Sequence, residues 1–282
     1  MKTQISLSPI ILFVYNRPYH TKQTIEALKK NELADSSDLI IYSDGPKVDI
    51  IESLHKVLEV REYLRTINGF KSIIIVEQSQ NIGLANSIIK GVTNIVNEYG
   101  KVIVLEDDIV TSKYFLKFMN EALNYYADKS KVWHVSGWNY PIDKTGLKDV
   151  FFTQTMICWG WATWSDRWNY FEKDINKSIT DFSEKEIMKF NLGGVANFWK
   201  QLLDNKKGKI DTWAIFWYIT IFKQNGLCLN PSQTFVENIG MDGSGVNCID
   251  SSDLISTLSY NKCIKFENRI YECQVASKRI KN

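Results

Sequence analysis

Apolar runs and amphipathic segments alternate along the first 110 residues of the chain. Apolar runs that are typical of strands occupy residues 10–14, 39–42, 71–77 and 101–105, and the last of these is typical of a strand buried on both faces. Helical periodicity fills the intervals between them, at residues 19–34, 50–66 and 84–98. Strands and helices that alternate in this way form a mostly parallel sheet with right-handed crossovers, so the expected fold class is α/β with helices flanking a central sheet.

The helical periodicity also assigns a core-facing side to each of these segments. In the second helix, at 50–66, it places Ile51, Leu54, Leu58 and Leu64 toward the core. In the first and third helices it places Ile25, Ala27, Leu28, Ile88, Val92, Ile95 and Val96 there. These assignments predict which single substitutions remove buried surface.

The second half of the chain has a less regular pattern. Strands are expected near 132–137 and 150–156, and helices near 111–127, 194–205 and 212–225. A linker rich in Pro, Gly and Ser is missing, so residues 1–250 are expected to form one domain with halves at about 1–110 and 111–250. Residues 251–282 are expected to be a basic C-terminal appendage.

Composition and charge exclude some classes of protein. The chain is 44% hydrophobic and 23% charged with a net charge of +2, as in an ordinary globular domain, and no global charge points to nucleic acid. Six Lys or Arg against two Glu after residue 259 make a basic tail that can contact anionic lipid, with a solvated terminus as the alternative.

Five widely spaced cysteines, an odd number, predict reduced thiols. The longest apolar stretch of the chain is about half as long as the roughly 20 residues that a membrane-spanning helix needs. We therefore expect a cytoplasmic protein, at most peripheral at the inner face of the membrane.

The most informative stretch is KVIVLEDDIV, residues 101–110, in which a buried strand leads directly into Glu106, Asp107 and Asp108. Three adjacent acids repel one another unless a cation or a set of donors lies among them. In open α/β sheets, ligands bind beyond the carboxyl ends of the strands. A hard divalent cation that carries substrate phosphates suits such a cluster.

Polar residues also follow the other predicted strands of the first half. They are Tyr15, Asn16 and Arg17 after the first strand, Asp44 after the second, and Asn81, Gly83 and Asn86 after the third. Together they offer a ring, a guanidinium, a carboxylate and amides for a nucleoside, although each alone is common in turns. Neither GxGxxG nor the P-loop pattern occurs, so phosphate must be bound in another way.

Three segments of the second half carry further candidate residues. In the segment 158–168, the spacing of Trp161, Trp164 and Trp168 indicates one face of a helix that follows a Trp-Gly-Trp loop. An indole there either stacks on a sugar or packs in the core. Asp211, before an apolar helix, is either an N-cap or a general base. A glycine-rich stretch, 236–248, contains Asp242 as a polar contact, and a plain surface loop is the alternative.

The ordered segments PIILFVYNRP, YSDGPK, NIGLANS, VLEDD, WGWATW, DTW and NIGMDGSG resemble those of bacterial GT-A glycosyltransferases. The likeness is to the N-acetylglucosaminyltransferase I type and more broadly to family 2 enzymes, and it covers about residues 8–248. It implies that Asp108 binds Mn²⁺ or Mg²⁺ and that Asp211 is the base of an inverting transfer. The implied nucleotide-sugar contacts are Val14, Tyr15, Asn16, Arg17, Asp44, Asn81, Gly83, Asn86, Glu106 and Asp107. The implied acceptor or sugar contacts are Trp159, Gly160, Trp161, Trp213 and Asp242.

The resemblance implies a transferase that moves a hexosyl or N-acetylhexosaminyl group from a nucleotide sugar, most simply a UDP sugar. Its acceptor would be a hydroxyl of a surface glycan on a lipid carrier or a protein, without a nucleic-acid partner. Asn247 stands where a histidine ligand is usual in such enzymes, which puts a second protein ligand for the metal in doubt. Two alternatives stay open: a sugar-phosphate nucleotidyltransferase, and a non-catalytic sugar-binding protein on a decayed transferase fold.

Overall fold

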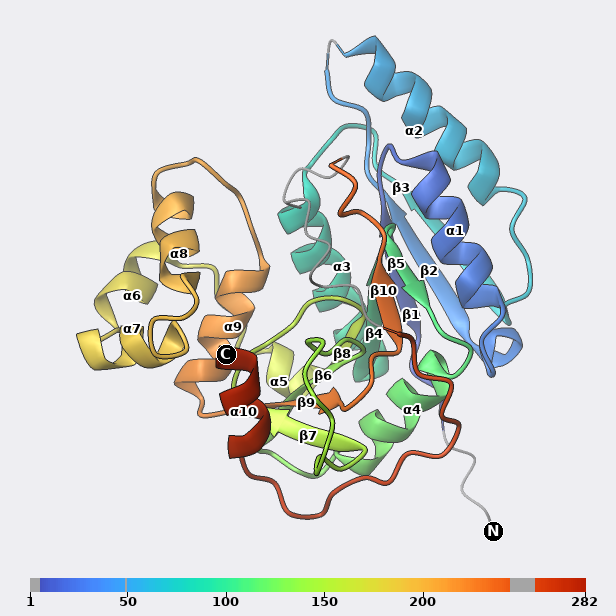
Figure 1. Cartoon of the computed structure of the whole chain (residues 1–282). Coiled ribbons are helices and arrows are strands. Elements are labelled where there is room, and N and C mark those ends of the chain that lie inside the picture. The colour runs from blue at the N-terminus through green and yellow to red at the C-terminus, as the bar shows by residue number, and fades with distance from the viewer. Residues whose placement is uncertain (1–5, 49, 244–256) are drawn as a thin grey trace.

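A computed structural model describes residues 6–48, 50–243 and 257–282, and its centre is a large twisted sheet (Figure 1). The eight strands of this sheet are β1 (Ile10–Val14), β2 (Asp38–Ser43), β3 (Ser72–Glu77), β4 (Lys101–Glu106), β6 (Val132–Ser136), β7 (Val150–Thr153), β8 (Trp161–Trp164) and β9 (Leu227–Pro231). They lie in the order β3-β2-β1-β4-β8-β6-β9-β7. One continuous sheet therefore runs through both halves of the chain.

The direction of the strands confirms the expected α/β class. Strands β3, β2, β1 and β4 pair in parallel, and so do β6 and β9. Only β8 and β7 run against their neighbours. The sheet is thus mostly parallel, and the carboxyl ends of β1, β2 and β4 lie at one edge.

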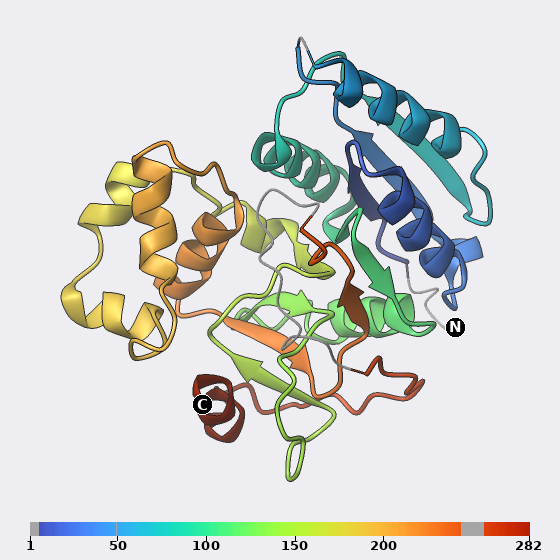
Figure 2. The same ribbon diagram turned by 45° about the horizontal axis from the view of Figure 1, so that its top comes forward.

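Helices cover both faces of this sheet (Figures 1 and 2). Helices α1 (Pro18–Lys29), α2 (Ile51–Leu64) and α4 (Phe115–Tyr125) contribute to one apolar core, together with residues such as Leu12 and Leu105. Helices α3 (Leu84–Tyr99) and α5 (Ser165–Trp168) contribute to the other, with Phe13 and Val104. Neighbouring strand residues alternate between the two cores, as the two-residue period of a strand requires.

Two sequence expectations about local structure are wrong. Residues 161–164 form strand β8 and not a helix, because they fill the place between β4 and β6, where Trp161 pairs with both Val104 and Ser136. All four residues of β8 are buried, so burial on both faces hides the strand period and leaves a misleading helical spacing of tryptophans.

In α2 the inward face differs from the predicted one. Ile51, Leu54 and Leu58 are exposed, by 72%, 42% and 44%. Ser53, Val57, Val60 and Leu64 face the core instead. Helix α2 packs against α1, and of the four predicted residues only Leu64 is buried.

Four further helices form a lobe beside the sheet (Figure 2). They are α6 (Ile175–Thr180), α7 (Glu184–Phe190), α8 (Phe198–Lys206) and α9 (Ala214–Lys223). A third apolar cluster that includes Phe182, Phe190 and Phe216 holds the lobe together. Helix α9 joins the lobe to the sheet, because its Trp217 and Ile221 belong to the core on the α3 face.

A tryptophan-rich core lies under α9. Trp161 and Trp213 are stacked, with ring centroids 5.0 Å apart, and are only 0% and 3% exposed. His134 of β6 stacks on Trp161 at 5.4 Å. Both tryptophans were expected to contact a sugar, and this expectation is wrong because their rings are enclosed by other side chains.

Short elements complete the described structure: the 3₁₀ helix η1 (Ala34–Ser36), the antiparallel pair β5 (Ile109–Thr111) and β10 (Val236–Asn238), and α10 (Gln274–Lys281). The C-terminal segment from residue 257 lies along the body: Phe266 packs against the core, and the Cys273 amide donates to the Phe152 carbonyl at 2.8 Å. Lys262 pairs with Glu32 and Arg279 with Asp143, so two of the six basic groups in the tail are paired with acids. Among the described residues, no helix combines the length and apolar character needed to cross a membrane.

Candidate active site

The three acids of the 106–108 triplet lie where β4 ends and the chain turns into β5. Asp107 and Asp108 are each 5% exposed, so both carboxylates are buried. The Asp107 carbonyl accepts a hydrogen bond from Thr24 Oγ1 at 2.8 Å, which ties this turn to α1. The predicted place of the acids, at the carboxyl end of a buried strand, is confirmed.

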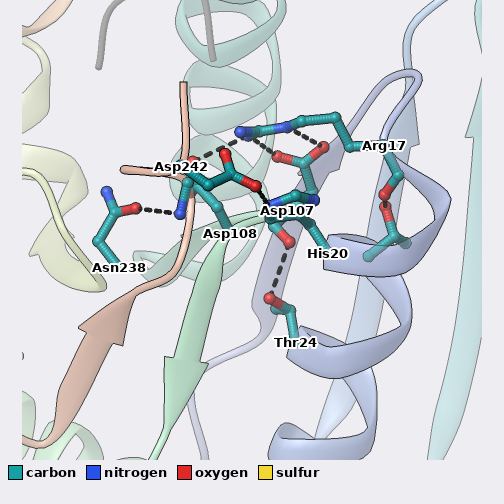
Figure 3. Close-up of polar contacts among 9 residues, drawn as sticks. Arg17, His20, Thr24, Asp107, Asp108, Asn238 and Asp242 are labelled. Atoms are coloured by element: carbon teal, nitrogen blue, oxygen red, sulfur yellow. Dashed lines mark hydrogen bonds and ion pairs between the residues drawn. The ribbon is translucent and has the colours of Figure 1, made fainter. Parts of the chain in front are cut away.

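Arg17, at the start of α1, lies between the two aspartates (Figure 3). Its Nη2 donates to Asp108 Oδ2 at 2.9 Å and also to Asp107 Oδ1, and its Nε donates to Asp107 Oδ2 at 3.3 Å. Burial opposes the positive charge, but both carboxylates favour it and the pKa of Arg17 is raised above its ordinary value. Arg17 is therefore a permanent cation that joins the ends of β1 and β4.

One guanidinium does not balance the charge of three acids. Burial, and then repulsion from Asp108 and Asp107, raises the pKa of Glu106 to about 8. Burial also raises the pKa of Asp107 to about 6, although Arg17 opposes this shift. Both shifts mean that the cluster stabilises additional positive charge, whether a proton or a metal cation.

The donor chemistry of this cluster fits a divalent metal held mainly by Asp108. Both Asp107 oxygens accept from Arg17, whereas Asp108 uses only Oδ2 in hydrogen bonds with the residues that the structure describes. The described ranges contain no group of three His, Cys, Asp or Glu that could hold a metal ion. Magnesium-type sites with one or two carboxylates rely on substrate phosphates and water for the remaining ligands, which agrees with this arrangement.

A second polar atom in the cluster requires a partner. Arg17 Nη1 is buried and makes no hydrogen bond with any described residue. An unsatisfied buried donor costs about 1–3 kcal/mol, and more when it is charged. A phosphate oxygen of a bound ligand would satisfy this donor, as guanidinium groups commonly do for phosphates.

The segment after β10 covers the acids (Figure 3). The Ile239 amide donates to the Asp108 carbonyl at 2.9 Å, and a Cβ on Gly240 would lie 2.2 Å from Asp108 Oδ2. Asp242 Oδ2 lies 3.1 Å from Nε2 of His20, which is on α1. The structure thus brings Asp242 close to the acidic triplet, and His20 is a site residue that sequence reasoning missed.

Asp44 has a structural role at the end of β2. Its Oδ1 accepts from the amides of Gly45 at 2.8 Å and Ile82 at 2.9 Å, and its Oδ2 accepts from Asn81 Nδ2 and the Gly83 amide, both at 3.0 Å. The predicted association of Asp44 with Asn81 and Gly83 is therefore present. These four donors occupy the carboxylate that was expected to bind ribose hydroxyls.

Arg61 of α2 is a further residue that the sequence did not single out. Its Nη2 donates to the carbonyls of Gln78 at 2.6 Å and Asp44 at 3.3 Å, and its Nε donates to Ser43 Oγ at 3.2 Å. It therefore holds together the carboxyl ends of β2 and β3. Its position in the middle of a helix gives no local signal for this role.

The other predicted nucleotide contacts are at the same edge but differ in availability. Tyr15 Oη and Ser53 Oγ are hydrogen-bonded at 2.6 Å, and the Val14 carbonyl accepts from the Asp44 amide at 3.0 Å. Val14 is buried, Asn16 is half-buried, and Asn86 is exposed and bonded to the Ile82 carbonyl at 2.8 Å. Among the predicted nucleotide contacts, Tyr15 and Asn16 thus lie next to Arg17 in sequence and have side chains that are only half-buried.

Asp211 is exposed and paired with Lys173. It is not an N-cap, because α9 begins at Ala214 and Trp213 holds the cap position.

Trp159 is half-buried and lies edge-to-face against Trp138 at 4.6 Å. Gly160, at φ +56°, is buried beside Val236 and Ile109. Asn247 lies outside the described residues, so its place relative to the acids stays a prediction.

No known protein family and no curated protein matches the sequence of this chain. Among solved structures, a mannosyltransferase from Pyrobaculum calidifontis in complex with GDP-Man and Mn²⁺ is 13% identical, with a TM-score of 0.44 over 79% of this chain and 72% of that one. S. aureus TarS 1–349 is 11% identical with a TM-score of 0.45, and its complex with UDP-GlcNAc is 10% identical with a TM-score of 0.47. Both TarS matches cover 82% of this chain, which spans 60% and 58% of the two TarS chains. Such low identities and scores assign no activity, and the α/β architecture of this chain follows from its own strand order.

Proposed function

We propose that the chain is a metal-dependent glycosyltransferase of the GT-A type that transfers a sugar from a nucleotide sugar, with UDP as the expected nucleotide. The observation that carries the proposal is the group that buried Asp107 and Asp108 form with half-buried Arg17 at the carboxyl end of β4. It combines carboxylate oxygens for a hard cation with a guanidinium nitrogen that has no described partner. A metal-bound diphosphate needs both kinds of group.

The proposed reaction is an inverting transfer. The acceptor hydroxyl oxygen forms a bond to the anomeric carbon while the bond from that carbon to the diphosphate oxygen breaks. The diphosphate leaves with the electron pair, and the hydroxyl proton passes to a carboxylate. A divalent cation bound at Asp108 would supply charge stabilisation for the departing diphosphate. Arg17 would bind the phosphates and keep Asp107 and Asp108 oriented.

Two carboxylates are candidates for the base. Asp211 is the residue that the sequence resemblance implies, and it is exposed and paired with Lys173. Asp242 is favoured by its contact with His20 beside the acidic triplet. Asn variants of each separate the two, because loss of the base lowers kcat while donor binding persists.

The proposal is tested by nucleotide release from UDP-, GDP-, CDP- and dTDP-sugars with and without Mn²⁺. We expect release from one donor class with the metal, and a loss of about 100-fold in Asp108→Asn, comparable to the removal of one group that stabilises a developing charge. Asp128→Asn is the matched control, because Asp128 is an exposed acid away from the site.

Other outcomes would support the alternatives. Pyrophosphate release from a nucleoside triphosphate and a sugar phosphate would identify a nucleotidyltransferase. Donor binding without turnover, with unchanged binding in Asp211→Asn and Asp242→Asn, would identify a sugar-binding protein. A glycan acceptor on a lipid carrier or protein, and contact of the basic C-terminus with a membrane, stay parts of the proposal that need acceptor and vesicle-binding assays.

A further inference from the structure

A cavity of about 230 Å³ lies between the sheet and the helical lobe. Trp138, Tyr140 and Trp159 line it from the loops that follow β6 and precede β8, and Phe198, Gln201 and Ala214 line it from α8 and the start of α9. None of the described residues that line it is charged, and Gln201 contributes its one amide side chain. We call this cavity the aromatic pocket.

The aromatic pocket lies toward the same edge of the sheet as the acidic triplet. Strand β8 begins at Trp161, which pairs with Val104 near the end of β4 and with Ser136 at the end of β6. Trp138 and Trp159 are therefore each two residues from this point. Between Trp159 and β8, Gly160 packs on Ile109, the residue after Asp108: a Cβ on Gly160 would lie 3.4 Å from Ile109 Cγ2.

Size and lining chemistry restrict what the pocket can hold. A dry apolar cavity of about 150 Å³ accommodates benzene, so 230 Å³ suits a slightly larger apolar group such as a substituted ring or a branched chain of six to ten carbons. A sugar ring fits poorly, because each hydroxyl that the pocket buries needs a hydrogen-bonding partner. Few hydrogen-bonding side chains line the pocket, chiefly the amide of Gln201 and the hydroxyl of Tyr140, and the Tyr218 hydroxyl already donates to the Phe190 carbonyl at 3.1 Å.

We propose that the aromatic pocket binds an apolar group of the acceptor, about the size of a phenyl ring or two isoprene units, so that the attached hydroxyl reaches the donor site. The proposal rests on the proposed glycosyl transfer and narrows its acceptor to molecules that carry such a group close to the accepting sugar. The edge-to-face pair of Trp138 and Trp159 supplies an aromatic wall for it.

The first test is binding of benzyl alcohol, which contains neither sugar nor nucleotide, followed by ligand-observed NMR. Ala214→Leu fills the pocket from the start of α9, and Ala127→Leu, at an exposed turn, is the control. We expect equal affinity in wild type and Ala127→Leu, and at least tenfold weaker binding in Ala214→Leu. Equal binding in all three proteins, or no binding to wild type, would overturn the proposal. If Ala214→Leu does not fold, Phe198→Trp narrows the pocket from α8.

The second test compares transfer to phenyl and methyl glycosides of the same sugars. Burial of the phenyl ring removes apolar surface from water, so kcat/KM for the phenyl glycoside should be at least tenfold higher than for the methyl glycoside. Equal values for the two acceptors would overturn the proposal even if benzyl alcohol binds. Failure of wild type to release nucleotide from any donor would instead refute the proposed function, and the benzyl alcohol titration would still judge whether the pocket takes apolar ligands.

Discussion

His134 should make the stability of this protein fall as the pH drops below about 7. Its Nδ1 accepts a hydrogen bond from Trp217 Nε1 at 3.2 Å, and its Nε2 lies 2.9 Å from the Ile157 carbonyl. An indole N–H can only donate and a carbonyl can only accept, so the ring is neutral with its proton on Nε2. A second proton on Nδ1 would face the Trp217 donor.

The size of the effect follows from the depressed pKa. Burial lowers the pKa of His134 from 6.5 to about 3, although the bond to Ile157 opposes this shift. Because the unfolded chain then binds the proton more tightly, the contribution is fully present above pH 6.5 and is lost as the pH falls toward 3. The loss is about 2 kcal/mol at pH 5 and approaches about 5 kcal/mol near pH 3.

The assay is urea unfolding of wild type and His134→Gln at pH 7.5 and pH 5. Other groups titrate too, so the informative quantity is the change with pH in the difference between the two proteins. We expect that difference to shrink by about 2 kcal/mol at pH 5. His55→Gln, at an exposed position on α2, is the control and should show no such change.

Two results would refute this reasoning. One is an equal loss of unfolding free energy in wild type and His134→Gln between the two pH values. The other is an NMR spectrum of the folded protein in which both ring nitrogens of His134 carry protons at pH 5. The NMR measurement applies even if His134→Gln is too unstable to study.

Three further predictions concern the site and its supports. Gly240→Ala puts a methyl group 2.2 Å from Asp108 Oδ2 and should lower nucleotide release about 100-fold; wild-type activity in this variant would contradict the geometry. Asp44→Ala leaves four donors without their acceptor and should lower the free energy of unfolding by about 3 kcal/mol in urea titrations. The control Asp35→Ala, at an exposed position, should change it little. An unchanged free energy in Asp44→Ala would show that the donors find other partners. Val57→Ala should lower the free energy of unfolding, measured in urea, by about 2 kcal/mol, and Leu54→Ala should lower it by less than about 0.5 kcal/mol. The opposite order would mean that the inward face of α2 is misassigned.

The polar residues at the strand ends illustrate how far sequence reasoning reached. Apolar runs located β1, β2, β3 and β4, and parallel pairing then required their carboxyl ends to meet. The approach of Arg17 to Asp107 and Asp108 followed from that rule, although no pattern indicated that the guanidinium would lie between the two acids.

Where both faces of an element are buried, or where a contact joins distant segments, sequence reasoning failed. Strand β8 has no exposed face, so its tryptophans could not reveal a two-residue period. Trp161 and Trp213 are chemically suited to stack on sugars, and only packing placed them in the core. His20 and Arg61 stand in ordinary helical positions. Their roles depend on contacts with Asp242, 222 residues from His20, and with Gln78, 17 residues from Arg61.

The sequence by itself determined the alternation of strands and helices and the location of the acids at a strand end, because both depend on local periodicity. Tertiary structure alone decided which groups remain available for a ligand. It engaged the carboxylate of Asp44 with four internal donors, left Arg17 Nη1 without a described partner, and formed the aromatic pocket from segments that are distant in sequence. Availability depends on what surrounds each atom in space, and the order of residues does not contain that information locally.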